Sequence, residues 1–411
     1  MKPHIPPALK NRRYFYLWLG LLISLAGSQM QITALFWHIR VLTGSPDPLA
    51  LGGIGLARIL PVILFSLVAG PVADAYDRRR ILFITQSLMA LTALSLALLT
   101  FSSHISLWQI YALTALQATA VAFDLPARQA MVPNLVPARD LPNAFSMQSI
   151  AANTGSVIGP MLAGLVIATL GQAFTYLFNA ISFLAVIVAL ILIGQVDQDM
   201  KRSTGVNISA MKDGFSFIFS RPIILSTMLL DFVATFFASA NTMMPIVARD
   251  ILKVGEVGYG FLSAAQPVGS VLAALVISQV HTVRRQGPTF LWAIVVFGVA
   301  TVAFGLTQVY ILALLALVLM GAADAVSTII RNTIRQLQTP DHIRGRMTAV
   351  NQIFFQGGPQ LGEVEAGVVA QLFGVPFAIV SGGIGCIVGM LLIIFKWPRL
   401  RYYNGDEPNP S

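Results

Sequence analysis

Charged residues are scarce in this sequence. Asp, Glu, Lys and Arg make up only 10% of its 411 residues, whereas hydrophobic residues make up 56%, and the mean hydropathy is +0.76. A soluble globular domain carries about 25% charged residues. Apolar runs of about 20 residues recur along the chain, and each is long enough to cross a hydrocarbon core of ~30 Å. The composition therefore excludes an ordinary soluble domain and predicts a helical protein that crosses a membrane many times.

Cysteine, paired histidines and phosphate-binding sequences are also lacking. The single cysteine, Cys386, excludes a disulfide framework, and the five histidines are scattered with no pair at metal-ligand spacing. The chain has no G-x-x-x-x-G-K-[ST] phosphate loop, which excludes an ATP-driven pump built within it. No arrangement of nucleophile, base and acid is visible. We therefore predict that the chain is not an enzyme and has neither a metal site nor a cofactor.

The apolar runs predict twelve transmembrane helices. A basic N-terminal stretch leads into a full-length apolar run without a small-residue cleavage site, so we expect a retained first helix rather than a signal peptide. The predicted helices are 14–41, 50–73, 79–102, 107–131, 142–170, 173–194, 222–248, 258–280, 289–307, 309–331, 347–373 and 376–397.

The basic residues indicate how these helices are oriented. Of the 26 Lys and Arg residues, 22 fall in the even-numbered loops and the two termini, and three fall on the other side: Arg40, Arg249 and Lys253. By the positive-inside rule we expect both termini in the cytoplasm. The net charge of +9 then reflects the orientation of the helices, together with attraction to anionic lipid. It does not indicate nucleic-acid binding.

The only long polar interruption, residues 194–214, divides the chain into two six-helix halves. The predicted divisions are an N-terminal half at 1–194, a cytoplasmic linker at 195–221, a C-terminal half at 222–398 and a cytoplasmic tail at 399–411.

The two halves contain a repeat. A shift of 203 residues places Pro137 on Pro340 and Arg128 on Arg331, and it brings four pairs of glycines into register. These pairs are Gly155 with Gly358, Gly159 with Gly362, Gly164 with Gly367, and Gly171 with Gly374. Two parallel repeats of this kind predict a transporter whose halves rock around a site near the membrane midplane.

Four stretches carry a family resemblance. "GPVADAYDRRR", residues 70–80, resembles the G-x-x-x-D-R-x-G-R-R loop signature of the major facilitator superfamily, and "GSVIGPMLAG", residues 155–164, resembles the Gly-Pro motif of its antiporters. "FDLPARQAMVPNLVP" and "QLGEVEAG" are similar to the drug:proton antiporter-3 branch, which contains macrolide and siderophore exporters. The resemblance covers nearly the whole chain. It implies an all-α membrane protein with twelve transmembrane helices in two pseudo-symmetric six-helix halves, the major facilitator fold.

The resemblance implies a latch at the inner membrane face, in the loop between helices two and three. Gly70 would allow close helix approach, Asp74 would pair with Arg78, and Asp124 is similar to the acid that pairs with the loop's arginine in relatives. The latch residues are Gly70, Asp74, Arg78, Arg79 and Asp124. The alternative is a basic turn that only determines topology.

A second implied element is the antiporter-type motif of helix five. Its residues are Gly155, Gly159, Pro160 and Gly164. We expect the glycines to form a face for close helix packing and the proline to bend the helix. Ordinary tight packing is the alternative. The arginine that better-known drug antiporters carry in helix four is replaced by Thr114, so a proton relay through it is not expected.

Ionisable residues inside the predicted helices are candidates for proton coupling or gating. A carboxylate at a helix centre costs about 2.5–3.5 kcal/mol on insertion scales, so such a residue faces a cavity, finds a partner or stays protonated. The candidates are Glu363, Glu365, Arg58, Asp231 and Asp324. A structural hydrogen bond or helix clamp is the alternative for both aspartates.

Glu363 and Glu365 lie about 200° apart around a helix, so we expect them to have different roles. Glu363 takes the place of Pro160 in the repeat. Glu363 and Arg58 lie at similar depths, about 15 Å and about 12 Å from the outer ends of their helices, and the family fold places helices two and eleven side by side. We therefore hypothesise that Arg58 pairs with Glu363 or Glu365 when the outward gate is closed.

By resemblance, helices one, four, seven and ten line the substrate cavity. Candidate cavity residues on them are Gln29, Gln31, Trp37, Gln117, Phe236 and Asn241. For Trp37, near the outer end of helix one, a place in the interfacial aromatic belt is the alternative. Apolar walls with scattered amides suit an amphipathic or bulky substrate.

The sequence thus predicts a secondary transporter that exports small amphipathic or bulky compounds, of drug or siderophore type, by proton antiport and alternating access. We expect a monomer in a bacterial cytoplasmic membrane, with a small-molecule substrate, protons and membrane lipids as partners and no nucleic acid. An importer, facilitator or lysolipid transporter of the same fold is the first alternative. A non-transporting membrane sensor or scaffold is the second, against which the short C-terminal tail argues.

Overall fold

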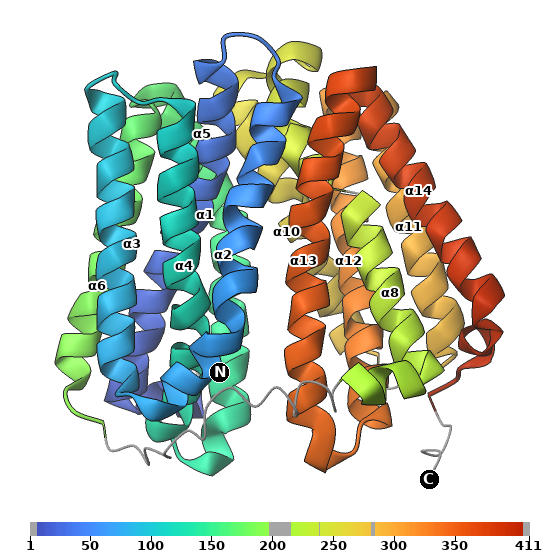
Figure 1. Ribbon diagram of the computed structural model, residues 1–411, viewed down its shortest axis with the longest axis horizontal. Coiled ribbons are helices and arrows are strands. Elements are labelled where there is room, and N and C mark those ends of the chain that lie inside the picture. The colour runs from blue at the N-terminus through green and yellow to red at the C-terminus, as the bar shows by residue number, and fades with distance from the viewer. Residues whose placement is uncertain (1–5, 197–214, 238, 281–283, 406–411) are drawn as a thin grey trace. The chain divides into compact units, whose positions relative to one another are not determined.

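The computed structural model describes residues 6–196, 215–237, 239–280 and 284–405, and this part of the chain consists of helices and turns without a β-strand (Figure 1). The α-helices are α1 (Arg12–Leu42), α2 (Pro48–Ala75), α3 (Arg78–Phe101), α4 (Leu107–Met131), α5 (Leu141–Thr169), α6 (Gln172–Ile193), α8 (Pro222–Phe237), α9 (Met244–Ile246), α10 (Gly255–Ser278), α11 (Gln286–Leu306), α12 (Tyr310–Gln338), α13 (Asp341–Phe373) and α14 (Val375–Lys396). The short turns used below are η2 (Val132–Asn134), η4 (Ala240–Met243), η5 (Val247–Ile251) and η6 (Pro398–Tyr402).

Capping side chains fix where several helices begin. The Asn11 carboxamide oxygen accepts from the backbone N–H groups of Arg13 and Tyr14 at the start of α1. The Asp77 carboxylate accepts from the N–H of Arg79 at 2.9 Å at the start of α3. Such caps satisfy backbone donors that have no partner within the helix. Inside a membrane all other backbone groups must also be paired, which is why the apolar runs fold as helices.

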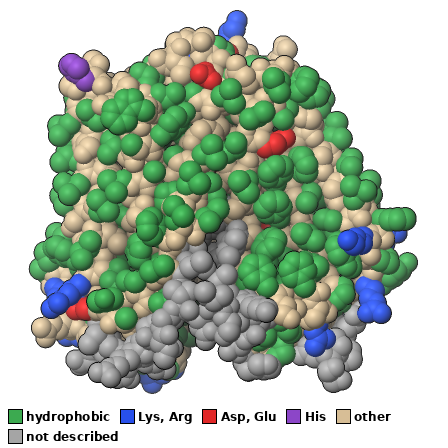
Figure 2. All heavy atoms as spheres, in the orientation of Figure 1, with side chains coloured by type: hydrophobic (Ala, Val, Ile, Leu, Met, Phe, Trp, Pro, Cys, Tyr) green, Lys and Arg blue, Asp and Glu red, His purple; other side chains and the backbone are tan. Residues whose placement is uncertain are grey.

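Ten of the described helices are long and apolar enough to cross a membrane, judged by length and composition. α8 is a shorter apolar helix, and α13 is a long helix of 33 residues with more polar positions. Figure 2 shows hydrophobic side chains spread over the visible face, with most of the visible Lys and Arg toward the lower edge. Large exposed side chains such as Ile84, Val276 and Leu392 suit contact with lipid. The fold agrees with the predicted twelve-helix major facilitator architecture.

The structure corrects the predicted helix boundaries in two places. The predicted helix 222–248 is interrupted: α8 ends at Phe237, and the chain continues as the 3-10 turn η4, the short helix α9 and the π-helix η5. The predicted helices 309–331 and 347–373 are longer, since α12 runs to Gln338 and α13 begins at Asp341. Hydropathy marks only the apolar length of a helix, so polar turns beyond the apolar run were missed.

The chain forms two compact units. Unit 1 comprises Met1–Gly44, Ala57–Val206 and Gly255–Ala264, and unit 2 comprises Ser45–Leu56, Asn207–Val254 and Ala265–Ser411. The helices α2 and α10 are each divided between the units. The predicted linker at 195–221 and the division into halves that depends on it stay predictions, because residues 197–214 lie outside the described part.

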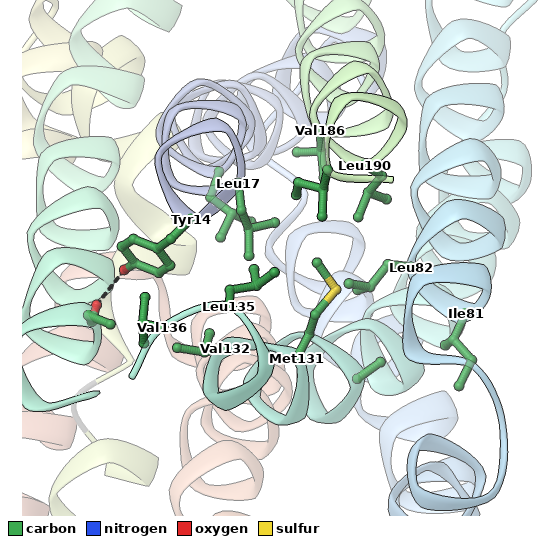
Figure 3. Close-up of a cluster of buried hydrophobic side chains, with 14 of the residues drawn as sticks. Tyr14, Leu17, Ile81, Leu82, Met131, Val132, Leu135, Val136, Val186 and Leu190 are labelled. Carbon is green, nitrogen blue, oxygen red and sulfur yellow. Dashed lines mark hydrogen bonds between the residues drawn. The ribbon is translucent and has the colours of Figure 1, made fainter. Parts of the chain in front are cut away.

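Unit 1 has a hydrophobic core where α1, α3, α4 and α6 meet at one end of the helices (Figure 3). Tyr14 and Leu17 of α1 pack there with Leu82 of α3 and Leu190 of α6. The Tyr14 hydroxyl donates to the backbone carbonyl of Ala144 at 2.6 Å, which ties α1 to α5. Burying this hydroxyl is tolerated because it has a partner.

In unit 2, α8 packs against α12, α13 and α14, and α11 packs between α12 and α14. A small core of Ile224, Met228 and Val350 joins α8 to α13. The chain after α14 returns to α11, because the backbone N–H of Gly287 donates to the carbonyl of Tyr403, the residue after η6, at 2.8 Å.

The same glycine contact occurs once in each unit. In unit 1 a Cβ on Gly260 of α10 would lie 2.7 Å from the carbonyl oxygen of Pro160 and 2.9 Å from Cα of Gly164. In unit 2 a Cβ on Gly52 of α2 would lie 2.8 Å from the carbonyl oxygen of Glu363 and 3.1 Å from Cα of Gly367.

These two contacts match the sequence repeat. Pro160 and Glu363 are repeat partners, and so are Gly164 and Gly367. The predicted equivalence of α5 and α13 therefore has a counterpart in packing. Within unit 2, the first part of α2, up to Leu56, lies beside α13.

Candidate functional site

A buried ion pair joins α8 to α12 in unit 2. The Arg331 guanidinium contacts the Asp231 carboxylate, and each residue is only 2% exposed. Arg331 also donates to the Thr328 hydroxyl at 2.9 Å. Burying charged side chains in this way is strongly unfavourable unless each has a partner. The structure thus places Asp231 in an ion pair that the sequence had not predicted.

Two further charged residues of α12 act on this pair. The charges of Asp324 and Arg335 both interact with that of Asp231, and Asp324 also interacts with Arg331. Arg335 is buried and donates to the side-chain oxygens of Asn332 and of Asn351 on α13. Asp231, Asp324, Arg331 and Arg335 therefore form one cluster, which we call the α8–α12 charge cluster.

The matching arginine of unit 1 is paired differently. Arg128 contacts Asp124 on its own helix at 2.9 Å, four residues earlier in the chain. Asp124 is 2% exposed and also accepts from the Gln86 amide at 2.7 Å and the Thr85 hydroxyl at 3.1 Å of α3. The expected pairing of Asp124 with an arginine of the 70–80 loop is not what the structure shows. A closer arginine on the same helix takes that place.

The loop arginines make other contacts. Arg78 donates to the carbonyl of Ala130 at 3.0 Å and to the Asn134 side chain at 2.8 Å, and it lies 3.9 Å from the exposed carboxylate of Asp74. Arg79 donates to the carbonyl of Leu190 at 2.8 Å. Within unit 1 these bonds fasten the start of α3 to α4, η2 and α6. The latch role itself stays a prediction.

Gly70 has no close neighbour within unit 1. A Cβ at this position would meet nothing within 4 Å in the part of the chain that the structure describes. The idea that Gly70 permits close helix approach stays a prediction.

The glycines of helix five do form a close-packing face. A Cβ on Gly155 would lie 3.0 Å from the backbone of Leu25 and Ala26 in α1. A Cβ on Gly159 would lie 2.7 Å from the carbonyl oxygen of Ala26. Gly164 faces α10 instead. The expected packing face is confirmed, and it contacts two different helices.

Glu363 and Glu365 lie on one uninterrupted helix, α13. With regular helical geometry they face directions about 200° apart, so both cannot line one cavity. The Glu363 side chain lies over Gly55 of α2, where an added Cβ would be 3.2 Å from its Oε2 atom. Coupling or gating by either glutamate, and their pairing with Arg58, stay predictions.

A chain of buried amides crosses unit 1. The Asn179 amide of α6 donates to the Gln31 oxygen of α1 at 2.6 Å, and the Gln31 amide donates to the Gln117 oxygen of α4. Gln31 is 1% exposed, whereas Gln117 is half-buried. Of these two cavity candidates, Gln31 is therefore placed to hold the three helices in register and to orient Gln117. Ser182 supports the far end by donating to the Asn179 oxygen at 2.9 Å.

Trp37 is buried and not part of an interfacial belt. Its ring stacks on that of Tyr259 with centroids 5.1 Å apart, and the Tyr259 hydroxyl donates to the carbonyl of Thr33 at 3.0 Å. Next to it, His38 Nδ1 lies 3.0 Å from the hydroxyl of Tyr176. These contacts fasten the segment 255–264 to α1 and α6 within unit 1.

The remaining cavity candidates are less informative. Gln29 donates weakly to the Ser156 hydroxyl at 3.3 Å, and Phe236 stacks on Phe232 with centroids 5.8 Å apart. The side chain of Asn241 lies outside the described residues.

Among the residues that are described, no group of three or more His, Cys, Asp or Glu could hold a metal ion.

Sequence reasoning missed three residues of these networks: Arg331, Asn179 and Tyr259. Arg331 was visible as the repeat partner of Arg128 but was assigned to the membrane surface. Asn179 was detectable as an amide within an apolar run, which is costly in a membrane and so marks a contact between helices. Tyr259 carries no such signal, because its partner is set by tertiary packing.

Two packing units of long apolar helices, with repeat-related helices and buried charges inside them, define a multi-pass membrane transporter. The transmembrane secretion effector model matches residues 5–409. The chain belongs to this family of the major facilitator superfamily, as its motifs predicted.

The similar proteins are also transporters. The enterobactin exporter EntS of Escherichia coli K12 is 26% identical over 343 residues, 83% of this chain and 82% of that protein. EntS of Citrobacter koseri is 28% identical over 347 residues, 84% of this chain and 82% of that protein.

Solved structures show the same fold. A bacterial homologue of the human lysosomal transporter Spinster gives a TM-score of 0.75 at 14% identity, over 99% of this chain and 100% of that chain. A POT family transporter in complex with 5-aminolevulinic acid gives 0.76 at 14% identity, over 95% of this chain and 97% of that chain.

Proposed function

We propose that this transporter exports small amphipathic or bulky compounds by alternating access, and that protons moving in the opposite direction drive the export. The observation that carries the proposal is the match to enterobactin exporters over 83% of the chain. Enterobactin is therefore the first compound to test. The proposed location is a bacterial cytoplasmic membrane, with both termini in the cytoplasm, and the proposed working unit is a monomer.

The buried carboxylates support proton coupling. Asp231 lies on a short apolar helix and is almost fully buried. Ionisable residues placed in membrane helices at this cost commonly belong to proton or substrate pathways. Glu363 and Glu365 on α13 are further candidates, with Arg58 as their proposed partner.

The amide chain supports a substrate with polar groups on an apolar body. Gln117 is half-buried at the end of the chain that starts at Asn179. A few fixed polar groups among apolar side chains are what orient a small amphipathic ligand. We therefore propose that Gln117 contacts substrate and that Gln31 positions it.

Transport in proteoliposomes tests the proposal. A thermal-shift screen that includes enterobactin first selects compounds that stabilise the purified protein. Vesicles with an acidic lumen should then accumulate the selected compound, since protons leave as the compound enters, and a protonophore should abolish accumulation. Glu363→Gln and Glu365→Gln, measured in parallel, show whether either glutamate carries the coupling.

The alternatives give different results. Accumulation only in vesicles with an alkaline lumen would indicate symport, as in an importer. Equilibration that ignores the gradient would indicate a facilitator or lipid transporter. Binding without flux in any vesicle would favour a sensor or scaffold.

A further inference from the structure

A cavity of about 200 Å³ lies at one end of unit 2, between the start of α8 and the end of α14. Its walls come from the first turns of α8 and from residues 396–400, which lead from α14 into η6. None of its described lining residues belongs to the α8–α12 charge cluster or to the amide chain of unit 1. We call this cavity the α8–α14 pocket.

The pocket combines an apolar interior with basic side chains. Apolar residues of both segments form most of its walls: Pro222, Ile223, Trp397, Pro398 and Leu400. The two charged residues that line it, Lys396 and Arg399, are both exposed. The one hydroxyl among its described lining residues, that of Ser226, already donates to the carbonyl of Ile223 at 3.0 Å. The cations therefore lie where the pocket meets its surroundings, and the interior is apolar.

The basic character extends beyond the lining residues. Three more arginines border the same segments of unit 2: Arg221 before α8, Arg401 in η6, and Arg285 before α11. The described residues at 215–226 and 390–405 contain neither Asp nor Glu. Figure 2 shows Lys and Arg side chains at the lower right of the visible face, the corner where α14 ends in Figure 1. This end of unit 2 is therefore suited to an anionic partner.

Exposed aromatic residues place the pocket at the level of lipid headgroups. Phe395 is 87% exposed and Tyr402 is 74% exposed, and the basic residues lie between them in the sequence. Aromatic side chains at the end of an apolar helix mark the boundary between hydrocarbon and headgroups. The Lys396 ammonium lies 4.8 Å from the ring centroid of Trp397, so a cation and an aromatic ring are already in contact there. By the positive-inside rule this level belongs to the cytoplasmic leaflet.

An apolar pocket with cations at its edge suits a phospholipid that carries a net negative charge. The headgroup phosphate would lie near Lys396 and Arg399, and an acyl chain would lie along Ile223 and Trp397. Basic pockets between membrane helices on the cytoplasmic side are known to bind such headgroups. A free phosphate ion is less well suited, because it requires several hydrogen-bond donors and the Ser226 hydroxyl is already in use.

We propose that the α8–α14 pocket binds an anionic phospholipid, such as phosphatidylglycerol, through Lys396 and Arg399. The bound lipid holds the start of α8 against the end of α14. This binding does not depend on the compound that the protein transports or on proton coupling.

Quenching of tryptophan fluorescence by brominated lipids tests the proposal in proteoliposomes of the full chain. Phosphatidylcholine vesicles contain the same small fraction of either brominated phosphatidylglycerol or brominated phosphatidylcholine. The difference between the wild type and Trp397→Phe gives the contribution of Trp397. Its quenching should favour phosphatidylglycerol by at least about fivefold, the effect of one basic residue at an anionic surface.

Trp108 supplies a reference within the same protein. It is 67% exposed and lies at the start of α4, outside the pocket. Its contribution, obtained in the same way from Trp108→Phe, should be quenched about equally by the two lipids, because no basic pocket lines it.

Two double variants separate the pocket from general surface charge. Lys396→Gln with Arg399→Gln should reduce the preference at Trp397 to that at Trp108. The matched control, Lys10→Gln with Arg139→Gln, removes the same charge from exposed residues outside the pocket and should keep the preference. If the first double variant is not recovered as a folded protein, Arg399→Gln alone must lower the preference.

Several outcomes would overturn the inference. They are equal quenching of Trp397 by both lipids, an unchanged preference in the pocket variant, and the same loss in both double variants. Loss of the preference when inorganic phosphate replaces chloride at equal ionic strength would indicate a site for a free anion instead. A preference that appears only after removal of residues 406–411 would assign the pocket to that acidic segment, which contains Asp406 and Glu407.

The assay contains neither a transported compound nor a proton gradient. Failure of the proposed export would therefore leave the quenching result unchanged, and failure of the lipid site would leave the export result unchanged.

Discussion

Arg128 and Arg331 occupy matching positions in the sequence repeat, yet they pair in different ways. Arg128 contacts Asp124 within α4, whereas Arg331 contacts Asp231 across to α8. The first pair is an internal feature of one helix, and the second joins two helices. The difference shows that a duplicated scaffold can keep its arginine while the acid that pairs with it moves to another helix. The pair in unit 2 therefore depends on how two helices pack, whereas the pair in unit 1 does not.

The glycine contacts show the opposite behaviour. Gly164 against Gly260 in unit 1 and Gly367 against Gly52 in unit 2 have nearly the same geometry. The residue one turn earlier differs, Pro160 in one and Glu363 in the other. Packing is thus retained in both units, and the chemistry beside it has diverged.

The largest expected effect comes from removing one partner of the inter-helix pair. Asp231→Ala should lower the free energy of unfolding by roughly 3–5 kcal/mol, because it leaves the Arg331 guanidinium buried without its counter-charge. Asp124→Ala should cost less, about 1–3 kcal/mol, since the Arg128 side chain is 17% exposed and can reach water. Chemical denaturation in detergent measures both.

A double variant sharpens this test. Asp231→Leu combined with Arg331→Met should recover most of the lost stability, because both charges of the pair are then removed together. Equal losses in the two aspartate variants would contradict the comparison.

Gly260→Ala and Gly52→Ala should each lower the free energy of unfolding by about 1–3 kcal/mol. The added Cβ would lie 2.7 Å from a carbonyl oxygen in the first and 2.8 Å in the second, so the helices must separate. Differential scanning fluorimetry of both variants checks whether the two contacts are equivalent.

Gly70→Ala is the matched control, since its Cβ meets nothing within 4 Å. It should be neutral or stabilise by up to about 1 kcal/mol, because alanine favours a helix more than glycine does. A loss as large as that of Gly260→Ala would show that Gly70 has a packing role after all.

Asn179→Leu tests the amide chain of unit 1. It should cost about 1–3 kcal/mol, because the buried Gln31 oxygen loses its donor, and it should weaken substrate binding by disordering Gln117. Thermal unfolding and a ligand-binding titration measure the two effects separately. Asn179→Asp is no substitute control, since it adds a charge, whereas Ser182→Ala removes only the outer support and should have a smaller effect.

The smallest effect is expected for an exposed ion pair. Arg139 lies 3.9 Å from Asp140, and its side chain is 86% exposed. Arg139→Ala should change the free energy of unfolding by less than about 1 kcal/mol, because water and salt screen such pairs. A loss comparable with that of Asp124→Ala, measured in the same denaturation series, would contradict the distinction between buried and exposed pairs.

Much of the fold was predictable because membrane-spanning helices are long apolar segments, which the hydropathy of the sequence marks. The ranges of α3, α4 and α6 were predicted to within one or two residues. The end of α8 at Phe237 was not, since the few polar residues beyond it are followed by the apolar run 243–248 and do not by themselves end a predicted membrane helix. The helix-five glycines were predicted as a packing face, but sequence spacing could not say that Gly164 contacts α10 while Gly155 contacts α1.

The candidate site was only partly predictable. Four polar residues in apolar helices were identified, because a polar group there costs free energy unless it has a partner or faces a cavity. They are Asp231, Asp324, Gln31 and Gln117. Their partners were not identified. For Trp37, a place at the membrane interface was an alternative, because the sequence indicates its position near the outer end of its helix. The sequence does not indicate that its ring stacks on Tyr259.

The sequence by itself determined the helical membrane class, the repeat and the superfamily, because each follows from local composition, residue spacing or a motif. The tertiary structure alone decided which acid pairs with which arginine. A long guanidinium side chain can reach an acid on its own helix or on a neighbour, and only the packing and rotation of the helices select one. That selection put Asp124 beside Arg128 within one helix and Asp231 beside Arg331 between two.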